Sequence, residues 1–373
     1  MSSVELVDTI CRTIRDESGD LGELVDRAVR RVAPLATADE RARLRSDAVA
    51  RMAGLGDLEM LVEDPEIDEV LVNGDQIWID RRGRVERAGT LHSTTIEQVI
   101  ERVLAPIGRR VDRTTPIVDA RLANGARVCA VVAPVAVGGA SLSIRRFSDE
   151  IRPLDDFTGP EGVAILRTIV AARANVIVCG ATSSGKTSLL ASMLDMVDDI
   201  ERLIVLEDTT ELPCRAPHVV RLEARPATAE GVHAVSLGDL VRTSLRLRPD
   251  RLVVGEVRSD ECIALVQAMN TGHDGSFSTC HANGPLDALL RLESLVLQAA
   301  PQWPLSAVRH QLARSIDVIV HVGRHGGRRR ILEVCEVVPP NVDGSLAAPG
   351  VRTLGRLRDD DIAGCTSLGR SRR

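Results

Sequence analysis

Apolar residues in the first 60 positions recur with the period of an α-helix, while arginine, aspartate and glutamate fill the positions between them. Such a period gives each helix one apolar face. We therefore expect a helical region whose members pack on one another. The positions that carry this pattern are Val4, Leu6, Val7, Ile10 and Ile14, followed by Leu24, Val25, Ala28, Val29 and Val32.

The pattern changes at Asp64-Pro65, after which short β-branched runs are separated by turn residues. Residues 69–73 and 76–80 predict two strands around an Asn-Gly turn, and residues 120–128 repeat this arrangement. A helical pattern covers residues 95–108. Hairpins combined with a helix predict a small α+β domain.

From residue 163 onward, short apolar runs alternate with helical stretches. Residues 176–179, 203–206 and 252–254 are β-branched and uncharged, as expected of strands that are buried on both faces. Residues 318–322 and 331–334 flank a Gly-Gly pair and predict a terminal hairpin. The alternation predicts an α/β domain built on a mostly parallel sheet.

Proline and glycine mark the boundaries between these regions. They interrupt the pattern between residues 148 and 162, and after Pro339-Pro340 the chain is rich in Gly, Arg, Asp and Ser. A segment of that composition has few apolar residues with which to fold. The predicted organisation is a helical region at 1–60, an α+β domain at 61–147, a linker at 148–162, an α/β domain at 163–340 and a mobile tail at 341–373.

Charge and aromatic content narrow the classes of partner. The chain carries 47 basic and 53 acidic residues, a net charge of −6, with two Trp, three Phe and no Tyr. Nucleic-acid binding relies on excess positive charge and, for single strands, on stacked rings. The eight cysteines lack zinc-site spacing, and the sequence shows neither a signal peptide nor a bilayer-spanning segment. We expect a cytoplasmic protein with no stable nucleic-acid partner.

A phosphate-binding loop follows the predicted strand 176–179. Residues 180–187 read G-A-T-S-S-G-K-T, which matches G-x-x-x-x-G-K-[ST], and a helical pattern follows. Glycines let backbone N–H groups curl around phosphate oxygens, and the N-terminus of the next helix adds positive potential. The residues expected to line the nucleotide are Gly180, Ala181, Thr182, Ser183, Ser184, Gly185, Lys186, Thr187 and Ser188.

The use of lysine supports this site. Of the 47 basic residues, only Lys186 is a lysine, and all the others are arginine. A compact, flexible ammonium fits between phosphates where the planar fork of arginine does not. The chain thus uses lysine only at the position where this chemistry requires it, which predicts a functional nucleotide site.

Acidic residues and histidines follow at the expected edge of the sheet. Glu207 directly follows the strand 203–206, and Glu256 follows the strand 252–254. The carboxyl ends of parallel strands form the crevice where a metal ion and an attacking water belong. His273 and His281 lie further along the chain, and taken alone such a pair is more often structural than catalytic.

In this order, the segments resemble the ATPases of bacterial type II/type IV secretion and pilus-assembly systems, most closely the tight-adherence (Flp-type) pilus assembly branch. The resemblance covers about residues 60–335 and implies a RecA-like P-loop NTPase domain, mostly parallel in its sheet, preceded by a smaller α+β domain and a helical region. The matching segments are 206–212 (Asp box), 247–258 (atypical Walker B), 268–283 (His box), and 108–112, 119–128 and 142–147 in the preceding domain.

The resemblance implies a role for each matching side chain at the phosphates. Lys186 and Thr187 would hold the phosphates and Mg²⁺. Glu256 would be the base or water-orienting residue and a metal ligand, and Glu207 would help to position the water or the metal. The expected cofactors are ATP and Mg²⁺.

Further residues are implied in sensing the terminal phosphate. His273 and His281 would sense the γ-phosphate and link it to domain movement. Arg127 and Arg145, from the N-terminal domain, would close over it, because positive charge stabilises the transition state of phosphoryl transfer.

The resemblance also implies partners and a location. We expect a homo-hexameric ring at the inner face of the cytoplasmic membrane that drives pilus assembly or protein secretion through integral-membrane platform proteins. A conjugative DNA-transfer motor would share the nucleotide chemistry and differ in its load. A regulatory module that binds nucleotide without turnover is a second alternative, and phosphate release would distinguish it.

Overall fold

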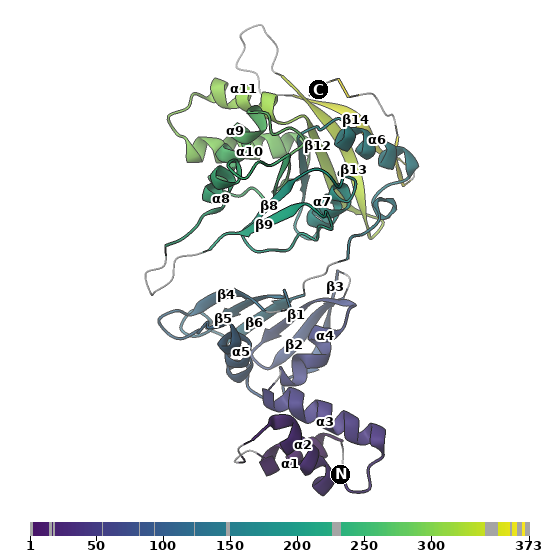
Figure 1. Cartoon of the computed structure of the whole chain (residues 1–373), viewed down its shortest axis with the longest axis vertical. Helices are drawn as coiled ribbons and strands as arrows, with labels where there is room; N and C mark the ends of the chain where they lie inside the picture. The colour runs from purple at the N-terminus through teal and green to yellow at the C-terminus, as the bar shows by residue number, and fades with distance from the viewer. Residues whose placement is uncertain are drawn as a thin grey trace. The chain divides into compact units, whose positions relative to one another are not determined.

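The chain forms two compact units in the computed structural model, residues 1–147 and residues 148–373, and each is described here by itself (Figure 1). The structure describes residues 3–14, 17, 19–53, 55–81, 83–92, 94–122, 124–146, 150–225, 233–339, 350–358, 360–363 and 368–369.

The first unit begins with three helices, as the apolar pattern predicts. Helices α1 (Ser3–Ile14), α2 (Leu21–Val32) and α3 (Ala38–Ala53) share one apolar core, in which Ile10, Val25 and Ala48 are fully buried. Asp20 caps α2 by accepting a hydrogen bond from the N–H of Glu23. A short turn, η1 (Gly56–Leu58), follows α3.

The rest of the first unit is an antiparallel sheet with helices packed against it. Its six strands are hydrogen-bonded in the order β3-β2-β1-β6-β5-β4. Apolar residues of β1, β2, β4, β5 and β6 enter a core shared with α4 and α5, whereas β3 is mostly exposed. The elements are α4 (Glu59–Glu63), β1 (Ile67–Asn73), β2 (Gln76–Arg81), β3 (Arg84–Thr90), α5 (Ile96–Leu104), η2 (Ala105–Ile107), β4 (Ile117–Arg121), β5 (Arg127–Val131) and β6 (Ser141–Arg145).

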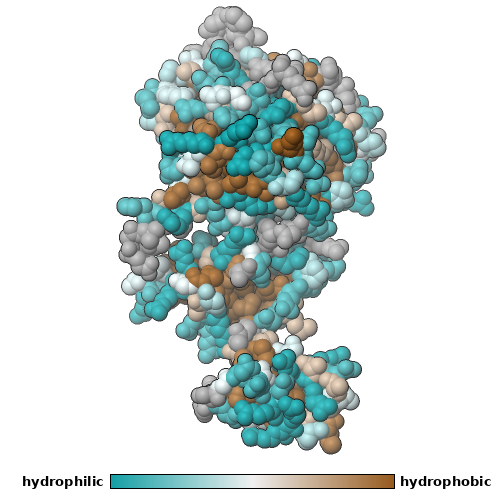
Figure 2. Space-filling view, viewed as in Figure 1, coloured by the Kyte–Doolittle hydropathy of each residue, from teal (hydrophilic) through white to brown (hydrophobic). Residues whose placement is uncertain are grey.

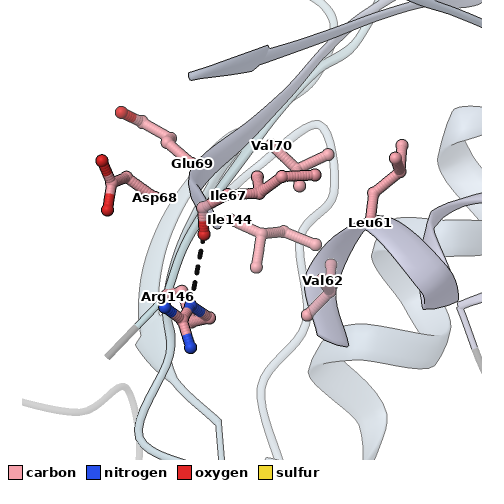
Figure 3. Close-up of a pocket in the computed structure, with 8 residues that line it drawn as sticks. All are labelled: Leu61, Val62, Ile67, Asp68, Glu69, Val70, Ile144 and Arg146. Carbon is pink, nitrogen blue, oxygen red and sulfur yellow. Dashed lines mark hydrogen bonds between the residues drawn. The ribbon is translucent and has the colours of Figure 1, made fainter. Parts of the chain in front are cut away.

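Figure 3 shows how α4 packs against this sheet. Leu61 and Val62 of α4 lie on the same side of β1 as Ile144, whereas Asp68 and Glu69 point away from them. The hollow between these elements leaves no space for a water molecule. It is part of the packed core, and we assign no ligand to it.

The second unit is built on a mixed sheet of nine strands in the order β15-β14-β13-β12-β7-β11-β10-β8-β9. The strands from β12 to β9 are parallel to their neighbours, and β13, β14 and β15 extend the sheet antiparallel. The strands are β7 (Val176–Gly180), β8 (Leu203–Glu207), β9 (Val219–Glu223), β10 (Arg251–Val254), β11 (Phe277–His281), β12 (Val318–His325), β13 (Arg328–Val338), β14 (Gly350–Arg358) and β15 (Asp361–Ala363).

Helices cover both faces of this sheet. Ile177 and Cys179 of β7 enter the core with α8–α11, and Val176 and Val178 enter the core with α6 and α7. This alternation explains why the parallel strands read as continuous apolar runs. The predicted fold class is confirmed.

The helices of the second unit are η3 (Leu154–Asp156), α6 (Pro160–Ala171), α7 (Lys186–Leu194), α8 (Leu237–Ser244), α9 (Glu261–Asn270), α10 (Pro285–Ala299) and α11 (Leu305–Ser315). None of the helices in the described part of the chain is long and apolar enough to cross a bilayer.

Two of the predicted boundaries are corrected. The tail was expected to be mobile, but β14 and β15 add to the sheet and bury Leu354 and Ile362. Residues 341–349, 359, 364–367 and 370–373 of that prediction lie outside the described residues. The second half of the expected linker belongs to the second unit, because Phe157 is fully buried and α6 begins at Pro160.

Asp361 of β15 explains how the end of the chain is held. Its carboxylate accepts hydrogen bonds from the N–H groups of Glu161 and Gly162 and from the Thr158 hydroxyl, each at 3.1 Å. The N-cap residue of α6, Gly159, has no side chain, and a Cβ there would lie 2.5 Å from the Asp361 Cγ atom. A residue about 200 positions along the chain therefore caps this helix.

We predict that Asp361→Ala lowers the free energy of unfolding of the second unit by about 1 kcal/mol, as the loss of a helix cap does. Urea unfolding followed by Trp303 fluorescence in a Trp78→Phe background measures this unit, because Trp78 lies in the first. Asp155→Ala, at an exposed aspartate, is the control. Equal stability of the two variants would contradict the assigned cap.

Candidate functional site

The carboxyl ends of four neighbouring parallel strands bring the predicted residues of the second unit together. His281 at the end of β11 is in register with Gly180 at the end of β7. Glu256 follows β10, and Glu207 ends β8, which pairs with β10. The Gly255 N–H donates to the carbonyl of Leu206 at 2.8 Å, so these two strand ends are fixed to one another.

The loop after β7 has the backbone that a phosphate cradle needs. A Cβ at Gly180 would lie 2.3 Å from the Val322 carbonyl oxygen, so only glycine fits there. Ser183 and Gly185 have positive φ angles of 57° and 102°, and α7 starts at Lys186. When left-handed and right-handed backbone conformations alternate, successive N–H groups point toward one concavity, here beside the N-terminus of a helix.

The ammonium of Lys186 has three polar partners, two in this loop and one on β11. It donates to the carbonyl oxygens of Gly180 at 3.1 Å and Ala181 at 2.9 Å, and it lies 3.3 Å from His281 Nδ1. Burial lowers the pKa of Lys186, and the negative charge of Glu256 opposes this shift. The only lysine of the chain thus sits at the centre of the site.

His281 connects this lysine to Glu256. Its Nε2 lies 2.9 Å from Glu256 Oε1, and the contact with Lys186 fits a neutral ring that accepts at Nδ1. Burial lowers the pKa of His281, which favours this neutral ring. Arg258 forms an ion pair with the other oxygen of Glu256. Four side chains therefore form one polar chain beside the loop.

Glu207 is buried, with an exposed fraction of 5%. Its Oε1 accepts hydrogen bonds from the N–H groups of Glu211 at 2.9 Å and Leu212 at 2.8 Å. A Cβ at Gly255 would lie 2.9 Å from Glu207 Cγ, so the side chain packs under the segment that carries Glu256. Burial raises its pKa to about 7, although the two N–H groups act in the opposite direction. This geometry favours a role in holding the loop and the neighbouring carboxylate.

His273 lies away from His281 in the structure, although both were expected to sense the γ-phosphate. It precedes the start of β11, whereas His281 ends that strand, and four steps along a strand span about 13 Å. The Nδ1 of His273 lies 3.2 Å from the carbonyl oxygen of Ala268, near the end of α9. His273 and His281 therefore lie near opposite ends of β11, and only His281 is at the carboxyl end, where the site is.

Arg127 and Arg145 are neighbours in the sheet of the first unit. They are directly paired on β5 and β6, and Arg121 on β4 is paired with Arg127. Three arginines therefore stand in one row across adjacent strands, and Glu69 on β1 follows next to Arg145. Arg121 was not singled out from the sequence, although the spacing of the Asn-Gly hairpin between it and Arg127 could have indicated the pairing.

The residues expected to hold Mg²⁺ fit that ion chemically. Thr187 lies in the first turn of α7 and Glu256 follows β10, and both offer the oxygen atoms that Mg²⁺ prefers. Nowhere in the described ranges do three His, Cys, Asp or Glu side chains gather into a metal-binding group. A site of few protein ligands suits Mg²⁺, which keeps several waters and binds substrate phosphates.

The raised pKa of Glu207 predicts a pH-dependent stability. Between the pKa of an unfolded glutamate, about 4.3, and about 7, the folded chain binds the extra proton, so the free energy of unfolding falls as the pH rises. Glu207→Gln removes this titration while keeping an acceptor. Relative to this variant, the wild type should lose stability on the order of 3 kcal/mol between pH 4.5 and pH 8. Urea titrations across that range measure the difference, and a pH-independent difference would refute the burial effect.

The chain is similar to known secretion and transfer proteins. The family model described as "Type II/IV secretion system protein" matches residues 51–337. A putative conjugal transfer protein of Mycobacterium tuberculosis is 38% identical over 339 residues, which cover 86% of this chain and 94% of that protein. The type IV secretion system protein PtlH of Bordetella pertussis is 30% identical over 305 residues, which cover 72% and 90%.

A solved structure shares the fold. The pilus retraction motor PilT with bound ADP superposes with a TM-score of 0.54 at 21% identity, over 77% of this chain and 84% of that one. At this identity the likeness concerns the fold alone. From the family match over most of its length, together with the loop and the polar residues beside it, this chain belongs to the type II/IV secretion system protein family.

Proposed function

We propose that this protein hydrolyses ATP with Mg²⁺ and acts as an oligomeric motor for a secretion or pilus-assembly machine. The observation that carries the proposal is the polar chain from Lys186 through His281 to Glu256, held beside the glycine-lined loop 180–187. A cation for phosphates follows β7 and a carboxylate for water follows β10, and β11 with His281 lies between these two strands. Hydrolysis of a phosphoanhydride requires both groups.

The chain's own residues have distinct tasks in this reaction. Backbone N–H groups of the loop and the N-terminus of α7 bind phosphate oxygens. The Lys186 ammonium exchanges the carbonyl oxygens of Gly180 and Ala181 for phosphate oxygens, which carry more negative charge. Glu256 orients the attacking water. Mg²⁺, held by Thr187 and Glu256, would neutralise part of the phosphate charge.

His281 and the arginine row are proposed to respond to the terminal phosphate. When Lys186 turns to the phosphate, His281 loses its contact at Nδ1 while it still faces Glu256. Arg127 and Arg145 would close over the γ-phosphate, and cations at that position accelerate phosphoryl transfer about 10³- to 10⁵-fold. Because they belong to the first unit, the reaction would be coupled to movement of that unit. His273 lies away from the nucleotide loop of its own chain. We therefore propose that it senses the γ-phosphate bound by a neighbouring subunit of the ring.

We further propose a homo-hexameric ring that docks on integral-membrane platform proteins at the cytoplasmic face of the membrane. Apolar residues gather in patches on the surface seen in Figure 2. Large apolar side chains are exposed in both units, among them Val137 at 95% and Ile200 at 81%. Exposed apolar patches favour contacts with other proteins, which supports an assembly of several chains.

Two kinds of macromolecule are candidates for the load, that is, for what the motor moves. Pilus assembly or protein secretion is our first proposal, and transfer of DNA is the alternative, favoured by the conjugal transfer name of the mycobacterial relative. The net charge of −6 and the scarcity of aromatic rings argue against direct contact with DNA.

We predict that Glu256→Gln binds ATP as tightly as the wild type but loses more than about 99% of its turnover, because general-base catalysis contributes 10²- to 10⁴-fold. Lys186→Ala should lose nucleotide affinity as well. Phosphate release and binding of a fluorescent ATP analogue measure the two effects. Turnover in Glu256→Gln at the wild-type rate would refute the role of this carboxylate.

For the load, we expect neither single- nor double-stranded DNA to raise the ATPase rate of the wild type at about 0.15 M salt. Dependence of any effect on salt distinguishes specific from purely electrostatic binding. A several-fold stimulation that survives this ionic strength would favour the DNA-transfer motor.

A further inference from the structure

The segment after β10 holds Glu256 and Arg258 side by side. Val257, between them, is fully buried, and its N–H donates to the carbonyl of Thr279 at 3.0 Å. In an extended segment, residues on either side of a buried one project to the same side. Glu256 and Arg258 accordingly form an ion pair.

Both ends of this segment are fixed. The Gly255 N–H donates to the Leu206 carbonyl at 2.8 Å. At the other end, Glu261 of α9, with an exposed fraction of 4%, accepts hydrogen bonds from the N–H groups of Arg258 and Ser259. An ion pair on a backbone that is already fixed loses less conformational entropy than one between two mobile segments.

The two oxygens of Glu256 face different partners. Arg258 holds Oε2, while Oε1 faces His281 and, through it, Lys186. Glu256 is 16% exposed and Arg258 is 55% exposed, so the carboxylate lies inside the site and the arginine closes it from the solvent side. The negative charge of Glu256 also acts on Lys186. Without Arg258, the carboxylate would turn toward the remaining cation and compete with phosphate for it.

We infer that Arg258 is a positioning residue for hydrolysis. It holds the Glu256 carboxylate in the orientation that leaves Oε1 toward the nucleotide and keeps the carboxylate away from Lys186. This inference rests on the proposed ATPase function and adds a residue to its machinery. Arg258 acts through Glu256 and contributes no direct contact with the nucleotide.

Arg258→Ala, Arg258→Gln and Arg258→Lys test this role, with Arg246→Ala, at an exposed arginine of the same unit, as the control. We expect kcat of the Ala and Gln variants to fall about 10- to 100-fold, as misplacement of a catalytic group does. KM and the Kd of an ATP analogue should change less than about twofold. Arg258→Lys should retain part of kcat, because lysine keeps the positive charge but lacks the planar guanidinium group of arginine. The control should keep the wild-type rate.

A double variant separates action through Glu256 from independent action. In a Glu256→Gln background, Arg258→Ala should cause no further loss of the residual turnover measured in single-turnover assays. A further loss, a rise in Kd at unchanged kcat, or a wild-type kcat in Arg258→Ala would each overturn the inference.

Two results keep this inference distinct from the proposed function. If the wild type releases no phosphate, the ATPase proposal fails, and this inference fails with it. If the wild type turns over and Arg258→Ala matches it, only the positioning role fails. Thermal unfolding of each variant establishes that the chain is folded, and the Gln variant, close in size to arginine, serves if the Ala variant does not fold.

Discussion

The site depends on keeping one ammonium group charged in a largely buried position. Burying a charge is costly unless polar partners replace the lost water. Lys186 finds these partners in two carbonyl oxygens of its own loop and in His281. They are neutral, so an anionic phosphate is a stronger partner for the same ammonium. The fold supplies this arrangement because parallel strands end at one edge, where glycine lets the loop turn back on itself.

Local patterns predicted the nucleotide loop and the strands around it, since buried parallel strands have a composition that can be read without knowing their neighbours. The sequence patterns failed to predict features that depend on contacts between separate segments of the chain. β14 pairs with the preceding strand β13, and β15 is held by Asp361, which caps α6 about 200 residues earlier in the chain. The composition of the tail indicates neither contact. The two histidines were grouped because they share one segment, but a strand runs between them. Arg258 was passed over because its significance lies in its pairing with Glu256.

In the proposed function, the two units contribute different side chains to ATP hydrolysis. The second unit contains the phosphate loop, the carboxylates and His281, and the first contains a row of arginines on adjacent strands. In the account proposed here, phosphate occupancy is the signal and the position of the first unit is the response. The relatives named for conjugal transfer and for type IV secretion are 38% and 30% identical to this chain, over 86% and 72% of its length. The proposed nucleotide chemistry would serve either load.

Because Lys186 is the only lysine in the chain, its side chain can be observed alone. Protein labelled with ¹³C at lysine should give one Cε signal from this residue, and titration with a non-hydrolysable ATP analogue and Mg²⁺ tests the account directly. We predict a saturable shift of that signal, as the ammonium leaves the carbonyl oxygens of Gly180 and Ala181 for phosphate. A signal that stays unchanged at saturating nucleotide would contradict the account.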